Sequence, residues 1–424
     1  MSFNIHNNIF YRILLFFIAL GLLIGSGSLF RYAYSYNMIM FFSLMLMAIV
    51  VFYQIFIPVN NLNQSTNLIS KSYEINYPGL ILLMFFIFFP IMSDVLNQVK
   101  SYEITYFHIA ILFLTFLIST QSREKILTYY LWIMVFLSFI SLIYFFTELF
   151  SDLPSFTPYY GIPETKLSHF YYFWSKPVKN FLIVRNQSIF WEPGAYGFHL
   201  IISTLLAYKS KNKLFIAILI IACVTTMSTT VYIFLSLLVL YQLFWGKNKI
   251  QFIGIMSFSL IIILVAIKSF FGNFEIPIHL INVVTEKFTT SSASYASFEE
   301  RTLYVAESMK LFLENIFIGA GHYATDVELT NIGSETSALS GLLAELGFFG
   351  IFCILLYIRF FKYFKILALP IALIWLNGEF MAYTAISLFI LTHMVSEIGQ
   401  KMFPPKIIDG NMYSRFSSNI PKYI

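Results

Sequence analysis

The chain has 424 residues, of which 58% are hydrophobic and 11% are charged, with a formal net charge of +5. Its mean hydropathy of +0.77 excludes an ordinary soluble domain, because a core of this size cannot bury so much apolar surface. We therefore expect an all-α polytopic integral membrane protein, whose helices satisfy their own backbone hydrogen bonds inside the bilayer. The modest positive charge does not indicate nucleic-acid binding.

Apolar runs recur along the whole chain and predict its helices. A helix needs roughly 20 apolar residues to cross a bilayer core, so the runs predict about twelve transmembrane helices. The runs lie at residues 9–25, 37–57, 79–99, 103–120, 127–148, 188–207, 214–227, 230–245, 250–271, 336–358, 364–377 and 380–398. The sequence shows no internal repeat, and residues 1–424 are expected to form a single membrane domain.

The stretch from Leu214 to Trp245 is too long for a single span. It contains the polar sequence TTMSTT at 225–230. A polar break in the middle of an apolar run predicts two helices joined by a tight hairpin.

Lysines and arginines in short connections indicate which face is cytoplasmic. Three basic segments bear on the helix count, namely KSKNK at 209–213, GKNK at 246–249 and RFFKYFK at 359–365. These segments share one face only if the hairpin exists, so they support twelve helices. The same parity places both chain ends inside, including a cytoplasmic tail at 399–424.

Two long polar segments, 149–187 and 272–335, then lie on the outer, periplasmic face. Long segments on one face of a helical membrane protein are candidates for function, since most connections are short. The first segment has four basic and two acidic residues, interleaved with aromatic residues such as Tyr171 and Trp174. Such a loop suits a substrate with an anionic group and sugar rings; the alternative is an interfacial aromatic belt.

Arg185 lies where the chain re-enters the membrane, in RNQSIFWEPGAYGFHL at 185–200. No carboxylate stands three or four residues away to neutralise it. Such a cation either reaches water or binds an external anion such as a lipid-linked pyrophosphate. Glu192 orients Arg185, binds a sugar hydroxyl, or is a carboxylate favoured at a helix start. Deeper in the run, His199 is expected to be a buried, hydrogen-bonded histidine.

The second outer segment, 272–335, holds three basic and nine acidic residues. This balance is typical of a lid whose carboxylates contact sugar hydroxyls, or of a solvated acidic face. A helix is predicted from Phe298 to Asn315, in which Lys310 has two glutamates at pairing distance. Arg301 has no carboxylate at those offsets, so we expect it to bind a ligand.

Two residues beyond this helix are candidate general bases. His322 ends the sequence GAGH at 319–322, where it either accepts a proton or caps a turn. Glu335 opens the next apolar run at the membrane face. It is either a base or an acid favoured at a helix start.

No metal site or disulfide is indicated. The outer face carries no Asp-x-Asp, His-x-x-x-His or cysteine ligand set. Cys223 and Cys353 both lie within apolar runs, so we expect two small buried side chains.

In layout and short motifs the chain resembles O-antigen and exopolysaccharide polymerases of the Wzy-like family, within the group that also includes O-antigen ligases. The motifs are RNQSIFWEPGAYGFHL at 185–200, the STT hairpin at 228–230, the second outer loop with Arg301, and GAGH leading to ETSALSGLLAELGFFG at 335–350. Ligases of the group show His-Asn-x-x-Leu before that last helix, whereas this chain has Glu335-Thr-Ser-Ala-Leu. The departure argues against a ligase and leaves the base open between the two candidates above.

The resemblance implies an enzyme of the bacterial inner membrane that polymerises glycan repeat units carried on undecaprenyl pyrophosphate, without a metal or other cofactor. It implies that Arg185 and Arg301 hold the pyrophosphate, while Glu335, His322 or Glu192 assists catalysis. Expected partners are the lipid-linked glycans, the bilayer and a chain-length regulator protein, but no nucleic acid. The alternatives are an O-antigen ligase acting on lipid A core, a lipid-linked oligosaccharide flippase or other transporter, and a non-enzymatic membrane scaffold.

Overall fold

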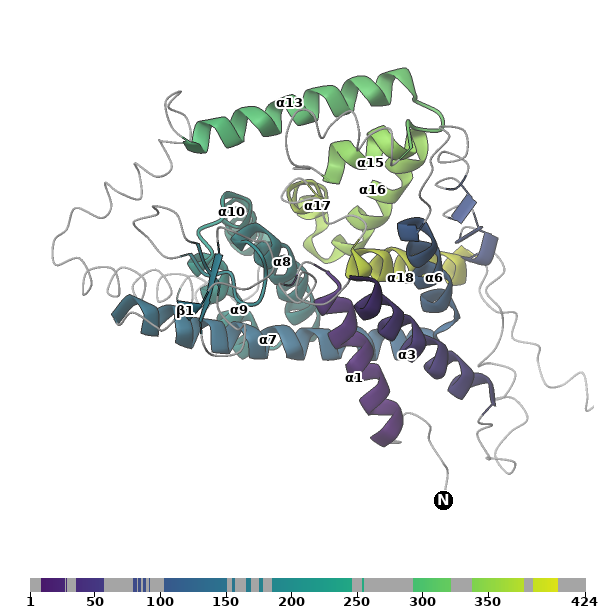
Figure 1. Cartoon of the computed structure of the whole chain (residues 1–424), viewed down its shortest axis with the longest axis horizontal. Helices are drawn as coiled ribbons and strands as arrows, with labels where there is room; N and C mark the ends of the chain where they lie inside the picture. Colours follow the sequence, from purple (N-terminus) through teal and green to yellow (C-terminus); the bar gives the residue numbers. More distant parts are fainter. Residues whose placement is uncertain are drawn as a thin grey trace, which may run out of the picture.

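The structure is a computed structural model, and it is mostly helical (Figure 1). It describes residues 9–26, 28, 36–56, 79–81, 83–84, 87–88, 91, 103–150, 155–156, 165–168, 175–177, 185–245, 254, 293–321, 338–376 and 384–402. The main helices are α1 (Ile9–Ile24), α3 (Tyr36–Phe56), α6 (Glu103–Leu117), α7 (Thr120–Phe150), α8 (Pro193–Ser210), α9 (Lys213–Thr225), α10 (Thr229–Trp245), α13 (Ala293–Glu314), α15 (Ala338–Leu346), α16 (Phe348–Phe360), α17 (Ala368–Leu376) and α18 (Ala385–Met402), with a 3₁₀ helix η2 (Lys362–Leu367).

One helical stretch among the described residues, Thr120–Thr147 within α7, is both long and apolar enough to cross a membrane. Shorter apolar helices of 10–17 residues lie within α1, α3, α9, α10, α16 and α18. The expectation of a mainly α-helical chain is therefore confirmed. Of the predicted runs, most of 79–99 and nearly all of 250–271 lie outside the described residues.

The predicted hairpin between two helices is present. α9 ends at Thr225 and α10 begins at Thr229. The Thr226 hydroxyl donates to the Cys223 carbonyl at 2.8 Å, within the last turn of α9. Hydroxyl side chains compete in this way for helical carbonyls and favour helix ends, which is why the polar break separates the two helices.

The run 336–358, predicted as a single span, is two helices in the structure. α15 ends at Leu346 and α16 begins at Phe348, with Gly347 between them at φ +57°. Glycine adopts this left-handed conformation without the steric cost that other residues carry. A Cβ at Gly347 would lie 2.5 Å from the Ile316 carbonyl oxygen, so the helix breaks where the segment after α13 meets it.

A small antiparallel sheet lies within the first long loop, where the sequence predicted no strand. Its strands are β1 (Ser155–Phe156), β2 (Thr165–Ser168) and β3 (Ser175–Pro177), in the order β1-β2-β3. Lys166 is the register partner of Lys176. Strands of two to four residues are too short for an alternating pattern to reveal, which explains this departure from an all-α chain.

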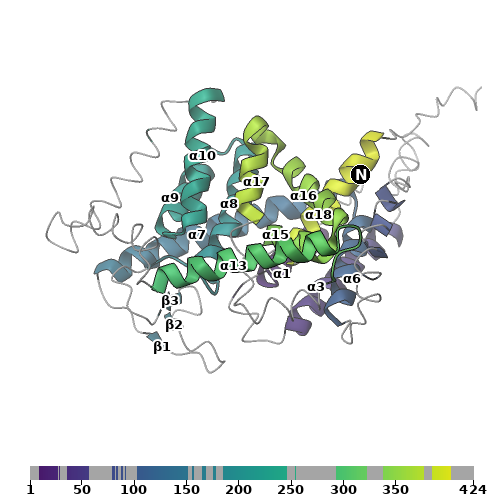
Figure 2. The same ribbon diagram turned by 90° about the horizontal axis from the view of Figure 1, so that it is seen from above.

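Helix ends gather at two opposite ends of the molecule. α8 runs antiparallel to α7, because Tyr196 near its start donates to Ser138 while Lys209 near its end binds Glu124. We call the end with the α9–α10 turn the hairpin end, and the end with the start of α7 the basic end. In Figure 2 the hairpin end is on the lower side of the view, and α10 runs upward from it. The strands β1–β3 and helix α13 also lie on the lower side.

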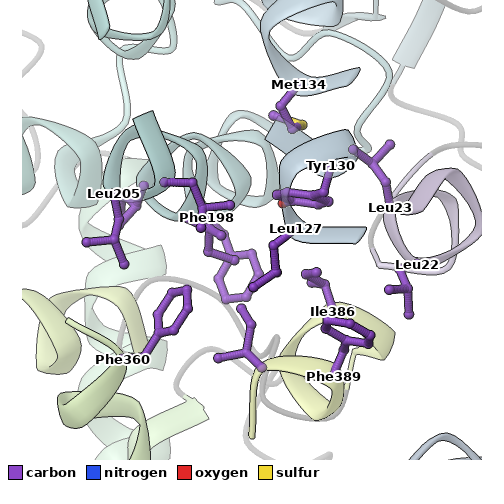
Figure 3. Close-up of a cluster of buried hydrophobic side chains, with 14 of the residues drawn as sticks. Leu22, Leu23, Leu127, Tyr130, Met134, Phe198, Leu205, Phe360, Ile386 and Phe389 are labelled. Carbon is purple, nitrogen blue, oxygen red and sulfur yellow. The ribbon is translucent and has the colours of Figure 1, made fainter. Parts of the chain in front are cut away.

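Apolar side chains from α1, α7, α8, α16 and α18 form one continuous core (Figure 3). Tyr130 and Phe198 lie near its centre, between α7 and α8. The opposite face of α7 exposes a stripe of large apolar side chains, namely Trp132, Phe136, Phe139 and Ile143. Their spacing of four, three and four residues puts them on one helix face, as expected of a surface that contacts an apolar environment.

The two basic segments that the structure describes, 209–213 and 359–365, lie at one end. Lys209 binds Glu124 at 2.8 Å, and His393 of α18 lies 3.4 Å from the same carboxylate. Lys362 binds Glu397, one turn further along α18, at 2.6 Å. The prediction that these segments share a face therefore agrees with the structure.

Candidate functional site

Residues 185–192 lead from the first long loop into α8, and Asn186 fixes them at the hairpin end. Its buried amide nitrogen donates to Ser141 Oγ of α7 at 3.2 Å and to Thr225 Oγ1 of α9 at 2.9 Å. Its side-chain oxygen accepts the Ser188 N–H at 3.1 Å. One asparagine thus joins α7, the α9–α10 turn and the entry to α8.

Arg185 is partly exposed and binds the same turn. Its Nε donates to the Thr226 carbonyl and its Nη2 donates to the Met227 carbonyl, each at 3.3 Å. Carbonyls that follow a helix carry partial negative charge, so they orient the guanidinium without supplying a full counter-charge. These partners lie 41 and 42 residues away in sequence, beyond the reach of any local pattern.

Glu192 is the N-cap residue of α8, which begins at Pro193, several residues later than predicted. Its carboxylate makes no capping hydrogen bond to the backbone. It accepts the Trp191 indole N–H at 2.9 Å instead. Of the three interpretations of Glu192, the position at a helix start is confirmed, and the indole holds the carboxylate beside the positively polarised end of α8.

His199 is buried within α8, as predicted. Its Nδ1 shares a hydrogen bond of 2.6 Å with the Tyr130 hydroxyl, and its Nε2 bonds to the Ser26 carbonyl. Phe190 stacks on its ring with centroids 4.5 Å apart. The histidine therefore links α8 to α7 and to Ser26, just beyond the end of α1, and its stacking with Phe190 packs the 185–192 segment against the core.

The glycine-rich segment 319–321 locks α13 against α15. The Ala320 N–H donates to the Ala344 carbonyl at 2.8 Å. A Cβ at Gly319, whose φ is +81°, would lie 2.0 Å from the Glu345 carbonyl oxygen. Residues 319–321 thus run against the backbone of α15, and glycine is required at 319 because the two backbones meet there.

The predicted helix with Arg301 is α13, and it lies on the side of the hairpin end in Figure 2. Tyr304 and Leu311 are buried against α15, which fixes one face of α13. Lys310 pairs with Glu307 at 3.5 Å, as the spacing predicted. The backbone of Arg301 belongs to this docked helix, while its side chain lies outside what the structure describes.

Both candidate bases, His322 and Glu335, lie outside the described residues. Arg185 and Glu192 lie seven residues apart on the segment that leads into α8, and their hydrogen bonds go to different partners, namely the Thr226 and Met227 carbonyls for Arg185 and the Trp191 indole for Glu192. The helix of Arg301, α13, lies on the same lower side of Figure 2 as the strands β1–β3, although Figure 1 separates the two across the height of the view. In the part of the chain that the structure describes, no group of three or more His, Cys, Asp or Glu side chains is placed to hold a metal ion. Cys223 and Cys353 are buried and unbridged, as predicted.

Sequence reasoning missed Asn186, the residue that positions this site. The polar break at 225–230 predicted a helix boundary, but it did not reveal that Asn186 would donate a hydrogen bond to Thr225 there. An asparagine beside an arginine at the mouth of an apolar run is the signal that was present.

No protein-family model matches the chain, and no curated protein or solved structure is significantly similar to it.

Proposed function

We propose that the protein is a membrane-embedded glycosyltransferase that polymerises undecaprenyl-pyrophosphate-linked repeat units into O-antigen or a related surface polysaccharide. In this proposal about twelve helices cross the bacterial inner membrane, both termini are cytoplasmic, and the hairpin end faces the periplasm. The basic end then faces the cytoplasm, in agreement with the enrichment of Lys and Arg in cytoplasmic connections.

The observation that carries the proposal is the placement of Arg185. It is a partly exposed cation, held by backbone carbonyls at the end of the molecule, on a segment that Asn186 ties to α7 and to the end of α9. A guanidinium fixed in this way is suited to a pyrophosphate, because its planar fork matches phosphate oxygens. The described strands of the first long loop place Lys166 opposite Lys176, which adds positive charge to the same loop.

The reaction we propose is a displacement at an anomeric carbon. A hydroxyl of the incoming repeat unit attacks that carbon of the growing chain and forms the new glycosidic C–O bond. The bond to the pyrophosphate oxygen breaks, and undecaprenyl pyrophosphate leaves with the electron pair. Arg185 and Arg301 stabilise the charge that develops on the leaving group, and Glu335, His322 or Glu192 accepts the hydroxyl proton.

The glycan profile of a strain that lacks the gene, resolved by size on a gel, tests this function. Core that carries a single repeat unit, with a full ladder after the gene is restored, identifies a polymerase. Bare core together with accumulated lipid-linked polymer identifies a ligase. An unchanged profile contradicts both functions and favours the transporter alternative.

Substitution of Arg185 tests the role of its charge. Arg185→Gln removes the cation, and we expect the glycan ladder to shorten to single repeat units. Arg185→Lys keeps the charge but not the planar guanidinium, so it should retain part of the ladder. Lys310→Gln is the matched control, because it removes an exposed cation that already pairs with Glu307 on the same side of the molecule. A full ladder in Arg185→Gln at normal protein level would contradict the assigned role.

A further inference from the structure

The basic end holds a second polar cluster, which takes no part in the proposed reaction. We call it the basic clasp. In it, side chains of α18 contact the start of α7 and the end of α16 with η2, and the end of α8 binds the same carboxylate of α7 as α18 does. Its residues are Arg123, Glu124, Lys209, Arg359, Lys362, His393, Ser396 and Glu397.

Positive charge is in excess in the basic clasp, since it has four Lys or Arg side chains and two carboxylates. Both carboxylates are engaged by other groups. Glu124 binds Lys209 at 2.8 Å and lies 3.4 Å from His393. The second carboxylate, Glu397, binds Lys362 at 2.6 Å. Arg123 is the buried cation that neither carboxylate binds, so its hydrogen bonds go to uncharged groups.

This cation, Arg123, is a residue that is only 2% exposed. Its Nη2 donates to Thr120 Oγ1 at 3.0 Å and to Ser396 Oγ at 2.5 Å. Its Nε and Nη1 are buried and have no acceptor among the described residues. Arg359 Nε is likewise buried without an acceptor among the described residues.

Three buried guanidinium nitrogens on two residues of one cluster lack an acceptor among the described residues, which points to a ligand rich in acceptors. Buried guanidinium donors are costly to leave without partners, and arginine makes no change of protonation that would relieve them. A phosphate group offers several oxygens and a formal negative charge, and its geometry matches the guanidinium fork.

We propose that the basic clasp binds a phosphate group, with the unfilled donors of Arg123 at its core. Arg359 and Lys362 form its mouth, because their side chains are 34% and 38% exposed and lie beside the buried part through Glu397. The phosphate belongs either to a phospholipid head group of the adjacent leaflet or to a free phosphate ester. In the orientation proposed above, that leaflet is the cytoplasmic one.

Native mass spectrometry of the purified full-length protein, released from detergent micelles, tests the site. Phosphatidylglycerol and inorganic phosphate are added in separate titrations, and the bound stoichiometry and the Kd are measured. We expect one tightly retained phosphatidylglycerol or phosphate in the unaltered protein. Arg123→Gln should raise the Kd at least tenfold, and Lys362→Gln, at the exposed mouth, should raise it several-fold without affecting folding.

Lys310→Gln is the control, because it removes one cation from the opposite end. Retention of the lipid alone assigns the phosphate to a head group, while displacement of the lipid by inorganic phosphate shows that a free phosphate ester enters as well. Equal retention by the unaltered protein and by both clasp variants would overturn the proposal, as would the absence of any retained lipid or phosphate. None of these readouts depends on glycan synthesis, so the experiment tests the phosphate site independently of the proposed polymerase function.

Discussion

Replacement of Asn186 by alanine tests whether one side chain holds the candidate site together. The change removes three side-chain hydrogen bonds, to Ser141 Oγ, to Thr225 Oγ1 and from the Ser188 N–H. A typical intramolecular hydrogen bond contributes about 1 kcal/mol net, so the free energy of unfolding should fall by about 3 kcal/mol. The loss is expected to be close to this sum, because Ser141, Thr225 and Ser188 are all buried.

Asn315→Ala is the matched control for the same chemical change. Asn315 donates a single side-chain hydrogen bond, to the Leu311 carbonyl at 3.1 Å, so its loss should cost about 1 kcal/mol. Thermal unfolding of both variants in the same detergent compares the two losses directly. At a permissive temperature, Asn186→Ala should also shorten the glycan ladder at normal protein level, because Arg185 is then held only by its own bonds to the Thr226 and Met227 carbonyls.

Equal Tm values for the two variants would refute the hydrogen-bond accounting. A normal ladder together with a lowered Tm would instead limit Asn186 to stability and separate it from the site. Asn186→Asp keeps the acceptor for the Ser188 N–H but loses both donated bonds. It should therefore be no more stable than the alanine variant, since it also buries a carboxylate.

Two further predictions concern packing at the two ends. Gly319→Ala forces a left-handed φ and a contact of 2.0 Å with a backbone carbonyl of α15, so hydrogen–deuterium exchange within α13 should rise; Gly254→Ala, where nothing lies within 4 Å of the new Cβ, should leave exchange unchanged. Gln54→Leu removes donors to Tyr11 at 2.5 Å and Ser122 at 3.0 Å, which join α3 to α1 and α7, and should cost roughly 1–3 kcal/mol in urea-induced unfolding. An unchanged transition midpoint would show that this network contributes nothing to stability.

The helical framework followed from the sequence because its physical causes are local. Apolar runs and the charges between them are visible along the chain, and the polar break at 225–230 was correctly placed between α9 and α10. The burial of His199 followed in the same way from its position inside an apolar run. A long apolar helix is predicted from composition averaged over many residues, so an unusual residue at one position changes the prediction little.

The break at Gly347 did not follow, because its cause is not local. A glycine inside an apolar helix costs only about 1 kcal/mol relative to alanine, so sequence alone does not decide between a continuous helix and a turn. The decision comes from Ile316, whose carbonyl approaches Gly347 only after α13 has docked.

The contacts of Arg185 were equally out of reach. The sequence showed that no carboxylate stood nearby along the chain, but it did not reveal that carbonyls of Thr226 and Met227 would take that place. Pairs of this kind are created by tertiary packing, which joins residues some forty positions apart.

The contact between the end of α1 and α18 has a consequence for biosynthesis. The Ile386 N–H donates to Ser26 Oγ at 3.0 Å, across 360 residues. At roughly 5–20 residues per second, translation takes roughly 20–70 s to deliver this partner to α1. During that interval α1 lacks its contact with α18, so the packing around Ser26 is complete only once α18 has been made. A ribosome that stalls before α18 therefore leaves an incompletely packed intermediate for the quality-control proteases.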